Sequence, residues 1–564
     1  MHVVLAHTPD GVQLTPLNDD GTPAPDRAPQ TLTLATLPDA VAQLEPEAPR
    51  WVWDDTSRWY PALLSAGVRV ERCVDLRLSH VILRNSAASA SSELANSPRG
   101  HWDTAAVALS TVTPEAALFD FDDAPAHGDD ADPVTEFRAQ RIAVATAPDP
   151  ARLGLLLAAE SAGALIAAEM RFAGLPWSEH RHDELLTSLL GPRPRPGTRP
   201  ALLDAVLARV RDELGAPELN PDSPNDLLRA LRAAGMIITS TRSWDLKQID
   251  HPAIPPLLEY KKLSRLLAAN GWHWLDTWVA DGRFRPDYVP GGVVTGRWAT
   301  SGGGALQLPK QIRGAVVPDP GWKLVVADAA QLEPRILAGL AGDTRMAEAG
   351  REDFYEGIVA TGAVATRAEA KVAMLGAMYG ATTGESGRLM PRLTRAFPQA
   401  IAHVEAAARA GERGEIVSTR LGRSSPLPGE DWQQAQGDAY GPEAGEAQQK
   451  RALSAARSWG RFTRNFVVQG TAAEWALCWM AGLRNRLWQL GEHMDDTQNG
   501  FTDRTHLVFF LHDEVMVHAP EHLAERVADE VRAAAVDAGR LIFGRMPITF
   551  PVTCAIVDSY ADAK

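Results

Sequence analysis

The chain has 564 residues, of which 45% are hydrophobic, so it is long enough to form several domains with full cores. A formal net charge of −15 excludes a uniformly basic surface, and any binding to nucleic-acid phosphates must therefore use local basic clusters. The three cysteines, Cys73, Cys478 and Cys554, lie far apart in the chain. This spacing argues against a disulfide framework or a Cys-x-x-Cys zinc site and favours a reducing cytoplasm.

The first part of the chain, residues 1–118, alternates short apolar runs with turns and predicts a small α/β unit. Strands are expected at Met1 to Ala6 and at Trp51 to Trp53. The acidic stretch from Asp120 to Asp130 predicts an exposed loop or a domain boundary.

Helical patterns begin at Pro150, break between Gly191 and Pro196, and continue to a long helix at about Leu257 to Ala269. Two glutamates interrupt the apolar stretch from Leu153 to Met170, and the N-terminus lacks a basic segment followed by an apolar core. Neither secretion nor membrane insertion is therefore expected.

Two apolar segments each end in a carboxylate. Trp322 to Ala327 predicts a buried strand that ends at Asp328, and Leu507 to Leu511 with Val515 to Val517 predicts a hairpin with His512-Asp513-Glu514 at its bend. Mg²⁺ takes one or two protein carboxylates and completes its shell with water and phosphate oxygens. Two such ions suit nucleotidyl transfer. Taken singly, Asp328 also fits a turn or cap residue, and the His512-Asp513-Glu514 bend also fits a solvated hairpin.

Between these segments, residues 366–380 predict a helix that places Arg367, Lys371, Leu375 and Tyr379 at successive i, i+4 steps. Two cations and an aromatic ring in this arrangement suit a nucleoside triphosphate. The alternative is an ordinary amphipathic helix with a solvated basic edge.

Further basic clusters are candidates for binding the DNA backbone, with a solvated helix face as the alternative. They are Lys261, Lys262 and Arg265; Lys310 and Arg313; and Arg457, Arg461 and Arg464. The stretch Ser424 to Gln449 is rich in Gly, Pro, Gln and Glu and predicts a flexible loop.

The order of these motifs resembles the family A DNA polymerases, the group that includes bacterial DNA polymerase I. The segment from Val325 to Arg335 resembles motif A of that family, the helix resembles motif B or the O helix, and the hairpin resembles motif C. Further matches in the expected order are Thr295 to Thr300 with Leu306 to Pro309, Arg313, Asn465 to Ala473, and Ile556 to Tyr560. The resemblance covers roughly residues 155–564.

The resemblance implies an α/β multidomain chain with the right-hand polymerase fold of palm, fingers and thumb. A polymerase domain would occupy residues 150–564. Its thumb would lie at about 150–290, its palm at about 291–345 and 465–564, and its fingers at about 346–464. Residues 1–149 would form a small exonuclease-like α/β domain.

The same resemblance implies roles for the charged residues. Asp328 and Asp513 would bind two Mg²⁺ ions, for which Mn²⁺ would be a substitute, and Glu514 would support the site from close by. Arg367 and Lys371 would hold the incoming triphosphate and neutralise charge on the leaving pyrophosphate.

Other positions would contact the nucleotide. Tyr379 would stack near the templating base, and Gly380 would let the template backbone pass. Glu333 would lie under the sugar and favour deoxyribonucleotides by filling the space that a 2′-hydroxyl needs. Gln331 and Leu375 complete the expected nucleotide site.

The remaining positions would contact DNA. Arg297, Asn465 and Gln469 would hydrogen-bond, together with Gln331, to the minor groove and the neighbouring backbone. Arg313 is a further expected DNA-binding residue, and His512 would contact the primer terminus.

The sequence departs from the family pattern at several positions. Ala329 and Ala330 replace the usual Tyr and Ser, and Met374 and Leu375 replace an Asn and an aromatic residue. Pro334 replaces a Leu and is expected to strain the start of the following helix. The carboxylates and the Arg/Lys pair are retained, so slow or unusual synthesis is expected.

A 3′→5′ exonuclease would need a cluster of acidic metal ligands that opens with Asp-x-Glu on a first strand. The early strands contain no Asp-x-Glu, and Asp54, Asp55 and Asp75 are isolated candidates. A vestigial, inactive exonuclease-like domain is therefore expected.

The predicted function is template-directed addition of deoxyribonucleotides to a primer 3′ end in DNA replication or repair, without proofreading. Two alternatives are a noncatalytic scaffold that binds primed DNA and a single-subunit RNA polymerase. The predicted partners are primer-template DNA and dNTPs, with no membrane. The resemblance further implies a monomer in the bacterial cytoplasm, associated with the nucleoid.

Overall fold

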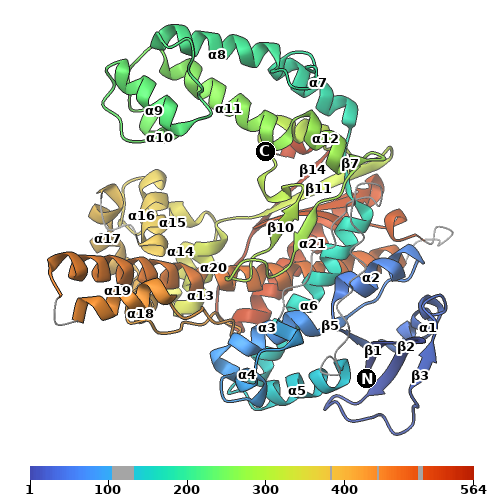
Figure 1. The fold of residues 1–564 in the computed structure, drawn as a ribbon. Helices are drawn as coiled ribbons and strands as arrows, with labels where there is room; N and C mark the ends of the chain where they lie inside the picture. Colours follow the sequence, from blue (N-terminus) through green and yellow to red (C-terminus); the bar gives the residue numbers. More distant parts are fainter. Residues whose placement is uncertain (104–131, 381–383, 441–443, 493–499, 564) are drawn as a thin grey trace. The chain divides into compact units, whose positions relative to one another are not determined.

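The computed structural model describes residues 1–103, 132–380, 384–440, 444–492 and 500–563 (Figure 1). The acidic stretch predicted as a loop, Asp120 to Asp130, lies outside the described residues. Two compact units make up the chain. Unit 1 consists of Met1–Ala173, Asp287–Ser301 and Val325–Ile556, and unit 2 consists of Gly174–Pro286, Gly302–Leu324 and Val557–Lys564.

The N-terminal part of unit 1 is a five-stranded sheet in the order β3-β2-β1-β4-β5. Its strands are β1 (His2–Thr8), β2 (Gly11–Leu17), β3 (Gln30–Leu32), β4 (Arg50–Trp53) and β5 (Cys73–Asp75). Strand β1 runs antiparallel to β2 and parallel to β4, and β4 runs parallel to β5. The predicted small α/β unit and both of its early strands are confirmed.

Five helices accompany this sheet: α1 (Leu37–Leu44), α2 (Thr56–Ser65), α3 (Leu76–Asn85), α4 (Glu93–Asn96) and α5 (Pro133–Ala145). The core between α2 and the sheet is aromatic, with Trp51, Trp53 and Tyr60 buried. Large rings of this kind each bury 150–250 Å² and dominate the stability of a small core.

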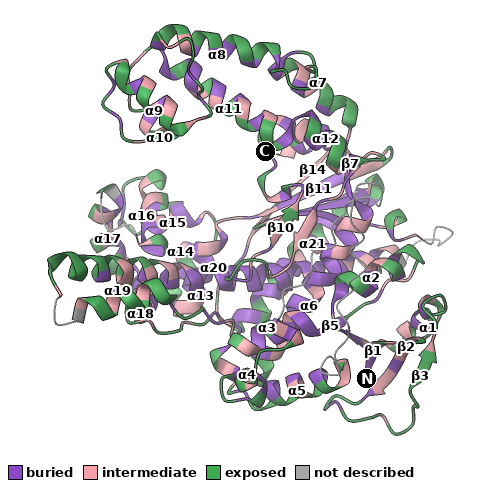
Figure 2. Cartoon of the chain, in the orientation of Figure 1, coloured by how far each residue is buried: buried purple, intermediate pink, exposed green. Residues whose placement is uncertain are grey.

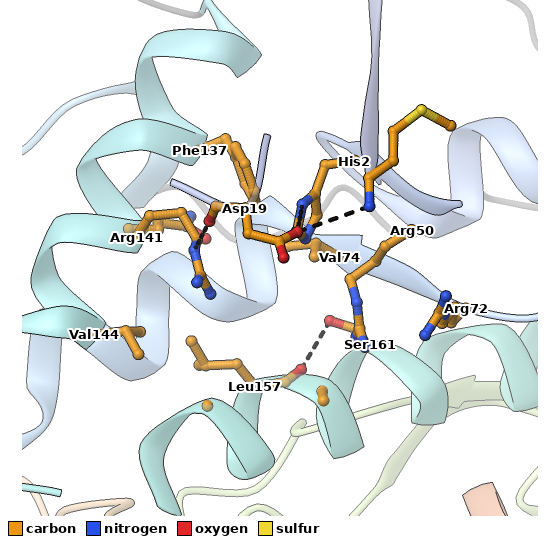
Figure 3. A pocket seen from close by; sticks show the side chains of 14 residues that line it. His2, Asp19, Arg50, Arg72, Val74, Phe137, Arg141, Val144, Leu157 and Ser161 are labelled. Carbon is orange, nitrogen blue, oxygen red and sulfur yellow. Dashed lines mark hydrogen bonds and ion pairs between the residues drawn. The ribbon is translucent and has the colours of Figure 1, made fainter. Parts of the chain in front are cut away.

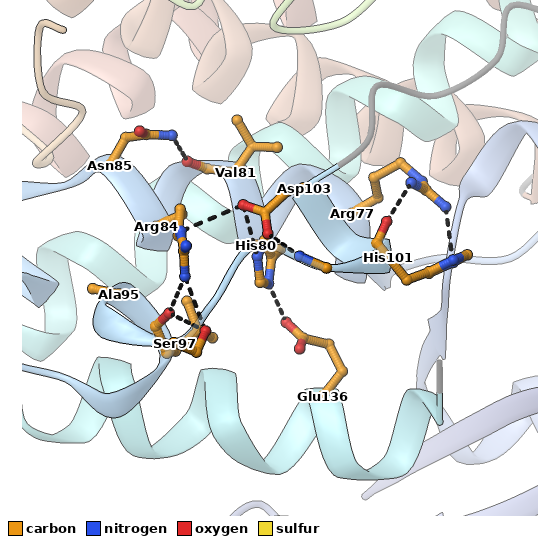
Figure 4. Close-up of polar contacts among 12 residues, drawn as sticks. Arg77, His80, Val81, Arg84, Asn85, Ala95, Ser97, His101, Asp103 and Glu136 are labelled. Carbon is orange, nitrogen blue, oxygen red and sulfur yellow. Dashed lines mark hydrogen bonds and ion pairs between the residues drawn. The ribbon is translucent and has the colours of Figure 1, made fainter. Parts of the chain in front are cut away.

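A buried polar network joins α3, α5 and the single turn His101–Asp103 (Figure 4). His80 Nδ1 lies 2.8 Å from Glu136 Oε1, and its Nε2 lies 3.7 Å from Asp103 Oδ1. Arg84 Nε is 3.4 Å from the same carboxylate oxygen. The contact between His80 and Glu136 pairs two buried groups that would be costly to bury alone, so it fixes α5 against α3.

Helix α6 (Pro150–Ala173) is the one described helix that is long and apolar enough to cross a membrane, but it packs inside unit 1 (Figure 2). Two thirds of its most apolar window is buried, as for the core helix of a globular domain. Glu169 on α6 is buried and accepts hydrogen bonds from Arg484 Nε at 2.8 Å and Tyr60 Oη at 2.5 Å. Burial disfavours both charges, but this pairing raises the pKa of Arg484 and lowers that of Glu169.

A second sheet has the order β12-β13-β11-β14. Its strands are β11 (Trp322–Ala329), β12 (His506–Leu511), β13 (Glu514–Pro520) and β14 (Val552–Val557). Strands β12 and β13 are antiparallel and pair Leu511 with Glu514 at the bend. The predicted strand before Asp328 and the predicted hairpin are both confirmed.

Helices surround this sheet and extend from it. They are α13 (Leu332–Ala341), α14 (Thr344–Ala349), α15 (Phe354–Ala360), α16 (Arg367–Tyr379), α17 (Gly384–Ala396), α18 (Pro398–Glu412), α19 (Glu430–Tyr440), α20 (Glu446–Glu492) and α21 (Ala524–Phe543). The loop predicted at Ser424 to Gln449 is wrong in part, because α19 and the start of α20 fall within it. Helix α13 contains Pro334 in its first turn, where backbone N–H groups have no intrahelical acceptor. Pro334 therefore costs no helix hydrogen bond, but Gln331, directly before the helix, has a φ of +49°, and the strain expected at its start stays a prediction.

Unit 2 is mainly helical. Its helices are α7 (Glu179–Leu190), α8 (Ala201–Leu214), α9 (Pro224–Ala233), α10 (Ser243–Leu246), α11 (Ile254–Asn270) and α12 (Trp272–Trp278). A small sheet orders β6 (Leu175–Pro176), β8 (Arg283–Phe284) and β7 (Val279–Ala280). The breaks predicted after residue 190 and the long helix predicted at 257–269 are confirmed by α7, α8 and α11.

The Arg484–Glu169 pair should be important for stability. Replacing Arg484 by Met leaves the buried Glu169 carboxylate without its main partner, and we expect a loss of about 3 kcal/mol in the free energy of unfolding. Arg486→Met is a matched control on the same helix, because the partners of Arg486, Glu530 and Asp537, are partly exposed. Its loss should be at most about 1 kcal/mol.

Guanidinium unfolding followed by tryptophan fluorescence measures both changes. Equal losses in the two variants would contradict a special role for the buried pair.

Candidate active site

The two carboxylates singled out from the sequence lie where strands of the second sheet end. Asp328 is near the end of β11, and Asp513 is in the bend between β12 and β13. The Ala329 N–H donates to the Asp513 carbonyl at 2.9 Å, so the backbone places the two residues side by side. Both side chains are half-buried, while that of Glu514 is fully buried.

His512 directly precedes Asp513 in the bend. It has a φ of +60°, a backbone conformation uncommon for a non-glycine residue. Partial burial of its ring and the nearby charge of Arg297 lower the pKa of His512, and Glu333 opposes this. The bend therefore lies next to Arg297 and Glu333.

Glu333, on the first turn of α13, is held by two donors. Arg297 Nη2 donates to Oε1 at 2.5 Å, and Tyr379 Oη donates to Oε2 at 2.6 Å. Burial and this hydrogen bond raise the pKa of Tyr379 to about 12, while Gln469 and Arg297 act in the opposite direction. Three segments far apart in the sequence thus meet at Glu333.

The turn between β11 and α13 is held by a buried arginine, Arg335. Its Nε donates to the Ala330 carbonyl at 2.9 Å, and its Nη2 donates to Gln331 Oε1 at 3.1 Å and to the Glu352 carbonyl at 2.5 Å. Burial lowers the pKa of Arg335 to about 10. Gln331 itself adopts the left-handed conformation, with a φ of +49°.

Helix α16 begins at Arg367 and ends at Tyr379, as predicted. Thr366 caps its first turn by accepting from the Glu369 N–H at 3.2 Å. Gly380 ends the helix at a φ of +73°, and a Cβ there would lie 3.0 Å from the Arg461 side chain.

The two cations of α16 differ in their surroundings. Arg367 Nη2 donates to Asp353 Oδ2 at 2.9 Å, and the guanidinium lies 5.4 Å from the Tyr355 ring centre. Burial acts against it, but the hydrogen bond from Arg367 lowers the pKa of Asp353. Lys371 is exposed and makes no ion pair with any residue that the structure describes.

The departures from the family pattern are all accommodated. Met374 is buried in the core, and Leu375 packs partly against it. Ala329 is buried, and the Ala330 N–H donates to the Pro551 carbonyl at 3.1 Å.

The expected DNA-contacting residues divide between the two units. Asn465 and Gln469 lie on α20, and the Asn465 Oδ1 atom is buried without a hydrogen-bond partner among the described residues. Arg464 is not a free basic residue, because its Nη1 donates to the Ala377 carbonyl at 2.9 Å and its Nη2 pairs with Glu405. Arg313 belongs to unit 2, where its guanidinium lies 4.3 Å from the Tyr560 ring centre.

The isolated acids of the N-terminal sheet have structural partners. Asp55 caps α2 by accepting from the Ser57 N–H at 2.9 Å, and Asp75 caps α3 by accepting from the Leu78 N–H at 3.0 Å. Asp54 accepts from Arg58 at 2.5 Å and from Trp59 at 2.6 Å. Nothing in the described part of the chain groups three or more His, Cys, Asp or Glu side chains for a metal ion.

The donor set at Asp328 and Asp513 nevertheless fits Mg²⁺. Two adjacent carboxylates supply the one or two protein ligands that this ion usually takes, and substrate phosphates and water complete its shell. A pair of this kind would bind metal weakly by itself and more strongly with a nucleotide present.

Arg335 and Asp353 were not singled out from the sequence. Arg335 could have been recognised from its i+4 position after Gln331, which suggests a contact within one helical turn. Asp353 had no such signal, since its pairing with Arg367 spans 14 residues and depends on how α15 packs against α16.

Comparisons with known proteins agree with this geometry. The thermostable DNA polymerase I of Thermus thermophilus is 27% identical over 349 residues, which cover 56% of this chain and 37% of that protein. The corresponding protein of Thermus aquaticus is 26% identical over 403 residues, covering 66% and 40%. The chain thus spans about two fifths of the length of these relatives.

The fold is similar to that of the POL domain of Pol1 from M. smegmatis, solved in complex with DNA primer-template and dNTP. The TM-score is 0.66 at 18% identity, over 100% of this chain and 95% of the other. The model of DNA polymerase family A matches residues 203–561, which is more than half of the chain. The protein therefore belongs to DNA polymerase family A.

Proposed function

We propose that the protein is a DNA-directed DNA polymerase that extends a primer 3′ end with deoxyribonucleotides. The observation that carries this proposal is the backbone contact between Ala329 and Asp513, which holds Asp328 and Asp513 together next to Glu333 and α16. Membership of the polymerase family supports the same chemistry. Primer-template DNA and dNTPs would be the substrates, and replication or repair in the bacterial cytoplasm, as a monomer, would be the role.

In this proposal Asp328 and Asp513 hold two divalent cations. When bound, such ions stabilise the negative charge that develops on the attacking and leaving oxygens. The primer 3′-oxygen forms a bond to the α-phosphorus of the nucleotide as pyrophosphate leaves. Lys371 and Arg367 bind the triphosphate and offset the charge of the pyrophosphate, and His512 contacts the primer terminus.

The second sheet with β10 (Ala299–Gly302), α13 and α21 would act as the palm, and α15 to α19 with the first part of α20 as the fingers. Helix α6, β9 (Asp287–Val289) and the helices of unit 2 would act as the thumb. The N-terminal sheet would be a vestigial exonuclease-like domain without proofreading, since its candidate carboxylates are occupied as helix caps and in side-chain contacts.

Primer extension tests the proposal. Asp328→Asn and Asp513→Asn should each lower the rate of extension with Mg²⁺ and dNTPs by about 10³-fold, or about 4 kcal/mol, because each removes a metal ligand. Asp529→Asn, an exposed carboxylate on α21, should extend at the wild-type rate. Electron paramagnetic resonance measures the binding of Mn²⁺. This binding should be weaker in Asp328→Asn and Asp513→Asn but unchanged in Asp529→Asn.

The same assay distinguishes the alternatives. Binding to primed DNA without extension under Mg²⁺ or Mn²⁺ would indicate a noncatalytic scaffold, and preferential use of rNTPs would indicate an RNA polymerase. Primer shortening when nucleotides are omitted would contradict the absence of proofreading.

Glu333 should select deoxyribonucleotides by occupying space under the sugar. Glu333→Ala should raise the use of rNTPs relative to dNTPs by about tenfold, while Glu333→Gln, of the same size, should keep most of the wild-type selectivity. Single-turnover incorporation with matched dNTP and rNTP measures the ratio. If both variants relax selectivity equally, the charge of Glu333 and its contacts to Arg297 and Tyr379 would be responsible in place of its size.

The contact between Asp353 and Arg367 should compete with nucleotide binding. Asp353→Asn keeps a residue that caps α15 but removes the negative charge. Because an exposed ion pair contributes up to about 1 kcal/mol, the KM for dNTP should fall about two- to fivefold.

Glu356→Gln is the control, since that carboxylate lies 4.0 Å from Arg367 and is more exposed. An unchanged or higher KM in Asp353→Asn would show that the pair does not restrain Arg367.

A further inference from the structure

A pocket of about 460 Å³ lies in the N-terminal part of unit 1, at the N-terminal ends of the parallel strands of the first sheet (Figure 3). His2 at the start of β1 is paired with Arg50 at the start of β4, and both line the pocket with Val74 of β5. The carboxylates Asp54 and Asp55 follow the opposite end of β4. The pocket is therefore separate from Asp54 and Asp55, the candidate carboxylates of an exonuclease-like site.

Three arginines line this pocket: Arg50, Arg72 and Arg141. Figure 3 shows Arg141 on one side of the opening and Arg50 on the other. Burial and the nearby charges of Arg72 and Arg141 lower the pKa of Arg50. Among the described residues, the Arg50 guanidinium makes no hydrogen bond or ion pair.

The protein supplies little negative charge in return. Asp19 is the one acidic residue of the lining, and its carboxylate is mostly exposed to solvent. Its oxygen lies 3.2 Å from His2 Nδ1, but the orientation makes no hydrogen bond. Burial lowers the pKa of His2 to about 4, so the ring is neutral at pH 7. Three guanidinium groups around one opening, in a chain with a net charge of −15, favour an anion.

The rest of the lining is suited to an organic group. Phe137, Val144 and Leu157 form an apolar wall, and the rings of Phe137 and His2 lie 4.8 Å apart. Gln140 also lines the pocket, and its buried Oε1 has no hydrogen-bond partner in the described part of the chain.

Three guanidinium groups beside an apolar wall favour a phosphate and an organic body in one molecule, and the volume is within the range of small-molecule sites. We propose that this pocket binds a nucleoside monophosphate, with its phosphate among Arg50, Arg72 and Arg141 and its base against the partly exposed Val74 and Leu157. The site is distinct from the proposed polymerase site and does not depend on that function.

Calorimetric titration of the 564-residue chain tests the proposal. The chain carries Arg367→Ala and Lys371→Ala, so that the polymerase site does not contribute. AMP should bind with a dissociation constant below about 1 mM, and ribose 5-phosphate, adenosine and inorganic phosphate should each bind at least about tenfold more weakly.

Arg50→Gln should weaken AMP binding by about tenfold or more. Its melting temperature should not fall, because Arg50 makes no hydrogen bond or ion pair in the protein. Arg138→Gln is the matched control. It lies on the same helix as Arg141 and, like Arg141, donates from Nε to a backbone carbonyl of the 19–21 turn, but it does not line the pocket.

Wild-type affinity in Arg138→Gln together with loss in Arg50→Gln would support the site. No AMP binding, or equal affinity in the Arg50 and Arg138 variants, would overturn it. Equal binding of inorganic phosphate and AMP would overturn the role of the base. Primer extension by Arg50→Gln in an otherwise wild-type chain should be unchanged, so failure of this proposal is distinguishable from failure of the proposed function.

Discussion

The proposed active site depends on holding two carboxylates close together although their charges repel. Repulsion between two unit charges 4 Å apart is about 4 kcal/mol at an effective dielectric constant of 20. The protein meets this cost through its backbone, since the hydrogen bond from Ala329 to Asp513 is part of the junction between β11 and the β12–β13 hairpin. The backbones that carry the two carboxylates cannot separate unless this junction opens.

The surroundings reinforce this arrangement from both sides. Arg335 ties the turn after β11 to the segment before α15, and Glu333 joins α13 to α16 through Tyr379. Each of these contacts is charge-assisted, and such contacts are shorter and stronger than neutral ones. Arg484 of α20 joins two further parts of unit 1 in the same way, because it donates to the Glu169 side chain of α6 and to the Val70 carbonyl just before β5.

Much of this could be predicted from local sequence patterns. The strand before Asp328, the hairpin at Asp513 and both ends of α16 follow from apolar runs, a Thr cap and a Gly at the C-terminus. The contacts that orient the side chains could not be predicted, because they join distant segments. Arg367 meets Asp353 and Gln331 turns toward the same carboxylate, so neither is directed by its own helix alone. The loop predicted from composition was also wrong in part, because the Gly- and Gln-rich stretch before Gln449 contains the helix α19.

The helix caps of the N-terminal sheet restrict what this part of the protein can become. Asp55 and Asp75 each hold the first turn of a helix, at a gain of about 1 kcal/mol apiece. Moving either carboxylate toward a metal ion would release that turn and weaken the packing of α2 or α3. A nuclease site built here by mutation would therefore need new acids, and substitutions that moved Asp55 or Asp75 out of their caps would be opposed by selection for folding.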